Sequence, residues 1–174
     1  MSKITFISHK MGLTKNEHTD FVGLKALKVK QTSQLALFEE WARAHNWMQF
    51  HASHYDWWMF PLSKPSQFGF AYVIYETEIR ELKQDPDFVR NYLRGVELLL
   101  LSWGWDLQKE AAIPEPDLDQ QWHNWPIRLY KCAVSLQEFG YAAEFNSVRN
   151  YARLLLKQGV SFEYNGRDLS TIFK

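Results

Sequence analysis

Residues 85–103 constrain the fold of this chain more than any other stretch. They begin with Asp85-Pro86, a capping residue followed by proline at the first helical position, and they end before Gly104. Apolar residues between these signals cover most of a helix surface: Phe88, Val89, Tyr92, Leu93, Val96, Leu99, Leu100 and Trp103. A helix that is apolar on nearly all sides has to be surrounded by other elements. We therefore predict a mainly α-helical, single-domain bundle with this helix buried at its centre.

Local patterns predict the elements around this helix. Thr32-Ser33 supplies a hydroxyl cap for a helix with apolar residues at 3-4 spacing. Residues 47–59 predict a shorter helix or irregular turn, and residues 70–75 are rich in β-formers. Further helices are expected over residues 77–83, from Pro126 to Gly140 and over about 142–157. The pair Asn165-Gly166 favours a small C-terminal β-hairpin.

The charge balance excludes some partners. The chain has 20 basic and 20 acidic residues, so composition gives no case for a nucleic acid or a membrane surface as partner. Residues 1–30 carry six lysines and are predicted to be a basic arm or a loosely packed segment, with residues 31–174 as a single helical domain. The proline-containing segment 105–119 is acidic, and we expect it to fold over that arm.

Cysteine usage and hydropathy favour the cytoplasm. Cys132 is the only cysteine, so an intrachain disulfide and a cysteine-based zinc site are both excluded. We expect this thiol to be buried on the core face of its helix. The first residues lack the apolar segment of a secretory signal, and no apolar run approaches the length of a membrane span.

The stretch from His51 to Pro61 places titratable groups beside the densest aromatic cluster in the sequence. A carboxylate can orient and charge an imidazole, so His54 with Asp56 or Asp106 is a candidate acid–base pair. Help from His123 and Arg128 completes the candidate catalytic set. The alternative is that His54 and Asp56 are polar groups satisfied at a helix end.

Metal and cofactor sites are not expected. His51 and His54 are three residues apart and could ligate a metal with a third ligand such as His123 or Asp106, but the pattern is incomplete. The chain has no nucleophile elbow, no glycine-rich phosphate loop and no dinucleotide fingerprint. We therefore predict no metal and no cofactor.

Six tryptophans occur as three close pairs, each next to polar or charged residues: Trp57 and Trp58, Trp103 and Trp105, Trp122 and Trp125. Together they could form a slot for a flat or cationic ligand or for a peptide. The alternative is that they form a hydrophobic core. We name five as candidate ligand- or partner-binding residues: Trp57, Trp58, Trp105, Trp122 and Trp125. Arg128 and Lys131 could bind an anion or the acidic face of a partner.

The segment His54-Tyr-Asp-Trp57-Trp58-Met-Phe60-Pro61 resembles the His-x-x-Trp-aromatic-x-Phe-Pro signature of a bacterial helical family of unknown function, some members of which are labelled calpastatin. Tyr72-x-Ile74 and Pro86 follow in similar order. The segment is less closely similar to the conserved region of opioid growth factor receptor proteins, at Tyr55, Trp58, Phe60 and Pro61. Both resemblances cover about residues 35–107, and they imply a mostly helical fold with an unassigned role.

These observations lead to two functional expectations. The first is a cytosolic, non-enzymatic helical module that binds a protein or peptide through a Trp-rich surface, because aromatic residues beside polar groups are enriched at binding hot spots. The alternative is a small hydrolase with a His/Asp acid–base site in a Trp-lined pocket. The two differ in whether the titratable groups converge on one hollow.

Overall fold

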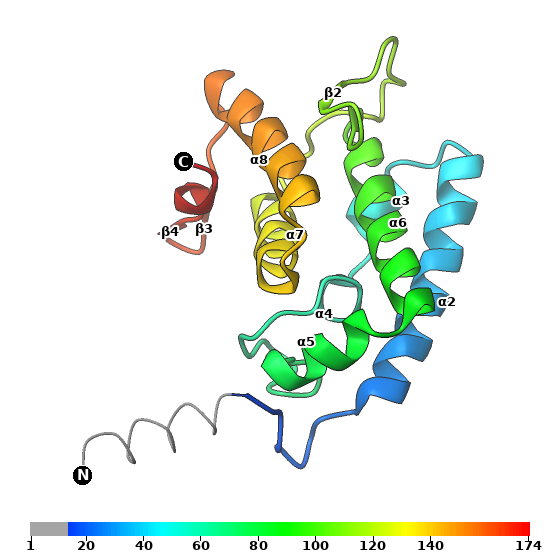
Figure 1. Ribbon diagram of the computed structural model, residues 1–174. Helices are drawn as coiled ribbons and strands as arrows, with labels where there is room; N and C mark the ends of the chain where they lie inside the picture. Colours follow the sequence, from blue (N-terminus) through cyan, green and yellow to red (C-terminus); the bar gives the residue numbers. More distant parts are fainter. Residues whose placement is uncertain (1–13) are drawn as a thin grey trace.

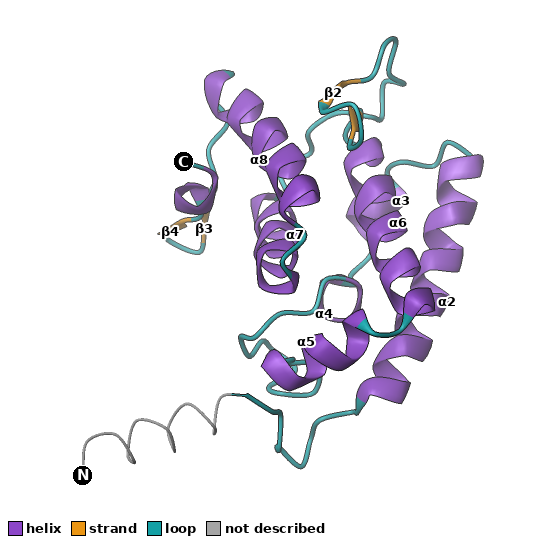
Figure 2. Cartoon of the chain, in the orientation of Figure 1, coloured by secondary structure: helices purple, strands orange, loops and turns teal. Residues whose placement is uncertain are grey.

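The computed structural model describes residues 14–174, and the chain is mainly α-helical, as predicted (Figures 1 and 2). The helices, in order, are α2 (Leu24–Arg43), α3 (Gln49–Ala52), α4 (Asp56–Met59), α5 (Glu76–Lys83), α6 (Pro86–Ser102), α7 (Pro126–Phe139), α8 (Ala142–Lys157) and the 3₁₀ helix η1 (Ser170–Phe173). Two antiparallel hairpins complete the fold: β1 (Trp105–Asp106) with β2 (Ala111–Ala112), and β3 (Glu163–Tyr164) with β4 (Arg167–Asp168).

Helix α6 is the buried helix that the sequence predicts. Asp85 caps it by accepting hydrogen bonds from the backbone N–H groups of Asp87 and Phe88, and Pro86 opens its first turn. Its side chains pack against α2, α5 and the start of β1. Gly95 lies in the middle of the helix, where an added Cβ would overlap the Cε of Met59 from α4. The absence of a side chain at this position therefore lets α4 approach α6 closely.

Helix α2 begins earlier than the predicted hydroxyl cap. It starts at Leu24 after Gly23, which has a φ of 88° and provides no side-chain cap. The hydroxyl of Thr32 instead donates to the carbonyl of Lys28 within the helix, over 2.9 Å. The predicted division between residues 30 and 31 therefore falls inside α2. The predicted basic arm lies in part outside the described residues, since the description begins at residue 14.

The described residues before α2 are tied to the body of the protein. Asn16 is buried, and its side-chain amide donates to the carbonyls of Phe70 and Val73 at 3.0 and 2.8 Å. Its backbone N–H donates to the carboxylate of Glu78 on α5 over 2.7 Å. This anchorage helps to hold residues 70–75 as a turn followed by irregular backbone, rather than as the strand that their composition favours.

The later helices follow their sequence signals. Pro126 begins α7, and Gly140 ends it in the left-handed conformation, with a φ of 79°. Helix α8 packs antiparallel beside α7, and η1 contacts both (Figure 1). Asn165 and Gly166 both have positive φ, as the turn of the predicted C-terminal hairpin requires.

The acidic segment 105–119 differs from its prediction as a simple loop. It contains the short β1–β2 hairpin, and its carboxylates do not contact the described residues before α2. Asp106 accepts hydrogen bonds from the backbone of Gln108 and Lys109, and Asp117 contacts His45 and Trp47. Lys28, one of the six early lysines, pairs instead with Asp85, the residue that caps α6. The expected cover over the described part of the basic segment is therefore wrong.

Candidate functional site

A buried ion pair joins the two halves of the chain. Arg128 on α7 donates from Nε to Oδ1 of Asp56 on α4 over 2.9 Å, and both side chains are almost fully buried. The same guanidinium donates to the carbonyls of Phe50 and Ser53, which close the end of α3. It also lies 4.2 Å above the ring centre of Tyr55. Buried charges are tolerated when they are paired and hydrogen-bonded in this way.

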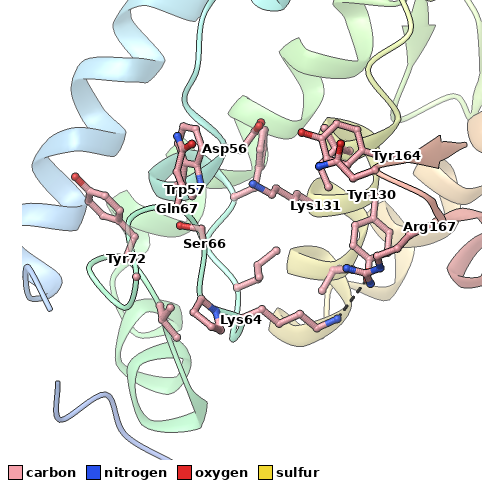
Figure 3. A pocket seen from close by; sticks show the side chains of 18 residues that line it. Asp56, Trp57, Lys64, Ser66, Gln67, Tyr72, Tyr130, Lys131, Tyr164 and Arg167 are labelled. Carbon is pink, nitrogen blue, oxygen red and sulfur yellow. Dashed lines mark hydrogen bonds between the residues drawn. The ribbon is translucent and has the colours of Figure 1, made fainter. Parts of the chain in front are cut away.

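A cavity of about 380 Å³ opens beside this ion pair (Figure 3). It lies between α4, the 62–73 loop, one face of α7 and the β3–β4 hairpin. Its floor contains the buried side chains of Phe60, Val73 and Val134. The other residues that line it are Asp56, Trp57, Leu62, Lys64, Pro65, Ser66, Gln67, Gly69, Tyr72, Ile127, Tyr130, Lys131, Tyr164, Asn165 and Arg167.

Lys131 is the half-buried cation inside this cavity. Its Nζ lies 4.8 Å from the ring centre of Trp57, and Figure 3 shows its amino end directed toward the hollow. It forms no hydrogen bond or ion pair with any residue of the described chain. Burial lowers the pKa of Lys131; Asp56 opposes this shift, whereas Arg128 adds to it. An anion that entered the cavity would relieve that cost of burial.

Two exposed cations stand on the rim of the same cavity. The Nζ of Lys64 donates to the hydroxyl of Tyr130 over 3.3 Å, and Arg167 extends from β4 toward the same hydroxyl (Figure 3). Neither Lys64 nor Arg167 has a carboxylate partner within the described residues. Among the described residues, Asp56 is the one carboxylate that lines the cavity, and it is paired with Arg128. The lining therefore combines an apolar floor, aromatic walls and an uncompensated positive rim.

The predicted catalytic residues are distributed over several places. Asp56 and Arg128 meet, but as a structural ion pair. His54 is exposed, and its ring contacts those of Trp57 and Trp125. His123 contacts the carbonyl of Asp119, and Asp106 caps its own turn. Among the described residues, no hydrogen bond joins His54 or His123 to Asp56 or Asp106, and the acid–base arrangement stays a prediction.

His51 lies in a separate aromatic cluster. Its ring stacks on Trp103 at 5.6 Å and lies 5.1 Å from that of His123. Burial lowers the pKa of His51 to about 3; His123 and Arg128 add to the shift, and the backbone of Ser102 offsets it in part. Within residues 14–174, neither ring nitrogen of His51 has a well-formed hydrogen bond. The imidazole is therefore neutral near pH 7 and serves as a packing group.

The tryptophan pairs do not share one hollow. Trp57 lines the cavity, while Trp58 hydrogen-bonds to Gln34 and lies beneath Lys30. Trp103 and Trp105 both contact the buried ring of Tyr151, and Trp122 contacts the ring of Trp103. Trp125 lies beside His54 and Arg128. Of the five tryptophans predicted to bind a ligand or partner, one, Trp57, lines the cavity.

Sequence reasoning named Lys131 as a possible anion ligand but missed Lys64, Tyr130 and Arg167. These three come from a loop, a helix and a hairpin that are distant in sequence. One available signal was the proximity of Arg167 to the predicted Asn165-Gly166 turn, which places its side chain at the end of a hairpin. No local pattern showed that this hairpin returns to α7.

The fold and the cavity define a helical domain with a cationic, aromatic-walled pocket. Compared with known proteins, the chain matches no family model, no curated protein and no solved structure. The family resemblance of residues 35–107 therefore stays a prediction. In residues 14–174, no helix has both the length and the apolar character needed to cross a membrane, and no three His, Cys, Asp or Glu side chains are grouped to hold a metal ion.

Proposed function

We propose that this chain is a polypeptide-binding module, and that the cavity beside Trp57 takes an apolar side chain of an acidic partner segment. The observation that carries the proposal is the arrangement of Lys131, Lys64 and Arg167 around one apolar-floored cavity, with no free carboxylate among the described residues that line it. An apolar anchor would bury against Phe60, Val73 and Val134. Carboxylates beside the anchor would then face the three cations.

The aromatic walls support a binding role. Trp57 presents its ring to Lys131, and it also forms a T-shaped pair with Phe68, with 4.7 Å between the ring centres. Phe68 itself is 43% exposed, so the apolar surface continues beyond the cavity. Aromatic residues next to cations are enriched at the energetic centres of protein interfaces. The hydrolase alternative would need a histidine hydrogen-bonded to Asp56 or Asp106, and the hydrogen bonds of the described residues join these carboxylates to Arg128 and to backbone N–H groups instead.

We also propose a reducing compartment, the cytoplasm, as the place of action. The only cysteine of the chain, Cys132, is fully buried on α7, and burial raises the pKa of its thiol well above the usual value. Such a thiol is poorly reactive and contributes as a small apolar group.

A matched pair of peptides tests the binding proposal. We expect acetyl-EDLDE-amide to bind with a Kd between about 10 μM and 1 mM, as for a small, transient contact, and acetyl-QNLNQ-amide to bind at least about tenfold more weakly. Titration calorimetry gives the affinity, and the emission of Trp57, isolated by comparison with a Trp57→Phe variant, reports the site. Added salt should weaken the acidic peptide's binding, because the rim cations are exposed.

Charge-reversal variants locate the binding. The double variant Lys64→Glu with Arg167→Glu should bind acetyl-EDLDE-amide at least about tenfold more weakly than the wild type does. Lys25→Glu with Lys157→Glu changes the net charge equally but alters exposed lysines outside the cavity, so we expect less than about a twofold change. Equal losses in the two double variants, or no binding to the wild-type protein, would contradict the proposal.

A further inference from the structure

The chain itself contains a segment with the chemistry that the cavity fits. In the sequence Pro114-Glu-Pro-Asp-Leu118-Asp119, one leucine is flanked by acidic residues. Leu118 is 84% exposed, the largest exposed fraction among the large apolar side chains that the structure describes. The carboxylates of Glu115 and Asp119 are also exposed and have no cationic partner in the described part of the chain.

Residues on both sides of Leu118 hold this loop in place. The carboxylate of Asp117 accepts a hydrogen bond from Nε1 of Trp47 over 2.8 Å and lies 2.7 Å from Nδ1 of His45. Both contacts lower the pKa of Asp117, and the hydrogen bond from Trp47 has the larger effect. Gln120 is buried, donates to the carbonyl of Leu101 over 2.8 Å and accepts from the backbone of Asp117. The loop therefore presents Leu118 in a fixed conformation, which reduces the entropy lost on binding.

The loop and the cavity lie on different parts of one molecule. The segment between β2 and α7 projects at the top of Figure 1, whereas α4, α7 and the β3–β4 hairpin, which border the cavity, lie below it. No residue of the loop lines the cavity. Trp47 and Leu101 hold the loop near α3 and the end of α6. A contact between this loop and this cavity has to join two molecules.

We propose that the cavity binds the Leu118 loop of a second copy of the chain. Leu118 enters the apolar floor beside Trp57, and Glu115 and Asp119 face the cations Lys64 and Arg167. This inference rests on the proposed function, because it names the partner of the same cavity. The two contacting surfaces differ, so the association is head-to-tail, and a bound pair of molecules still offers one free loop and one free cavity.

A mixing experiment tests the pairing directly. The cavity variant Lys64→Glu with Arg167→Glu keeps its loop, and the loop variant Leu118→Ser with Asp119→Lys keeps its cavity. All four changes fall on exposed side chains, so both variants should fold, as circular dichroism will check. By sedimentation velocity, the wild type should form a series of oligomers at high concentration, and each variant alone should stay monomeric.

The mixture of the two variants gives the decisive result. It should form a heterodimer of twice the monomer mass and nothing larger, because only one intact loop and one intact cavity remain in the pair. A mixture that stays monomeric, or a wild type that stays monomeric up to about 1 mM, the weak limit for a small interface, would overturn the self-association.

The inference can fail separately from the proposed function. If acetyl-EDLDE-amide binds at the cavity while the wild-type protein stays monomeric, the partner is an acidic segment of another protein and the self-association is wrong. If neither the peptide nor the loop binds, both proposals fail. Oligomers that persist unchanged in both double variants would show an interface elsewhere and would also overturn this inference.

Discussion

Arg128 and Asp56 lie 72 positions apart in sequence, yet the Nε of Arg128 donates to Oδ1 of Asp56 over 2.9 Å in the interior of the protein. The same guanidinium also binds the carbonyls of Phe50 and Ser53. A single side chain of α7 therefore binds three hydrogen-bond acceptors in the segment from the end of α3 to the start of α4. Asp56, at the end of this segment, lines the cavity.

Removal of this arginine should destabilise the protein strongly. Arg128→Met leaves the Asp56 carboxylate buried without its cation, and we expect a loss of about 3–5 kcal/mol in the free energy of unfolding. Urea denaturation followed by circular dichroism gives the value. The double variant with Asp56→Leu should recover part of the loss, because no unpaired charge then remains. A double variant that is less stable than Arg128→Met alone would contradict this account.

Protonation of His51 should make the protein less stable in acid. Its pKa is about 3 in the folded protein and near 6.5 when unfolded, so below pH 6.5 the unfolded chain binds the proton more tightly. Stability should therefore fall as pH decreases from about 6.5 toward 3, by at most about 1.4 kcal/mol per pH unit from this group. His51→Phe should flatten the unfolding profile in this range. Parallel profiles for the variant and the wild type would rule out this role.

Gly95 should resist substitution although it lies in a helix. Alanine there raises helix propensity by about 0.5–1 kcal/mol, but its Cβ would overlap the Cε of the buried Met59. We expect Gly95→Ala to destabilise the protein by about 1–3 kcal/mol through overpacking. In a double-mutant cycle, Gly95→Ala should cost much less in a Met59→Ala background. Strict additivity of the two changes would contradict the predicted steric conflict.

Ser135 joins three segments through its hydroxyl. It donates to the carbonyl of Pro61 over 2.7 Å and lies 2.8 Å from the hydroxyl of Tyr92, which donates to it. Ser135→Ala should lower the free energy of unfolding by about 1–3 kcal/mol, because the buried Pro61 carbonyl and the buried Tyr92 hydroxyl both lose their partner. Tyr92→Phe keeps the bond to Pro61 and should cost less. Chemical denaturation of the two variants compares them, and the reverse order would refute the assignment.

Much of the fold could be predicted because its signals are local. Asp85-Pro86, Pro126 with Gly140, and Asn165-Gly166 each specify a boundary through their own backbone preferences, and the structure confirms all three. The start of α2 was missed because Gly23 supplies no side-chain cap. The β1–β2 hairpin was missed because strands of two residues are too short to show an alternation of apolar and polar residues.

The site was less predictable because its parts meet only in the folded chain. Nothing near Arg128 in sequence shows that its guanidinium is buried against Asp56 rather than exposed for catalysis. Trp103 and Trp122 were grouped with Trp57 by their residue type, although they pack around Tyr151 in the core. Pairs of tryptophans predict burial well, but the choice between a core and a ligand site depends on long-range packing.

The reach of Arg128 also bears on how the protein is made. While the ribosome has not yet released α7, the nascent chain has no Arg128 guanidinium to bind the Asp56 carboxylate and the Ser53 carbonyl. We expect these contacts to form only after about 70 further residues have emerged, which takes about 4–14 s at typical rates of synthesis. The segment between α3 and α4 therefore gains these polar contacts only after α7, in the second half of the chain, has been synthesised.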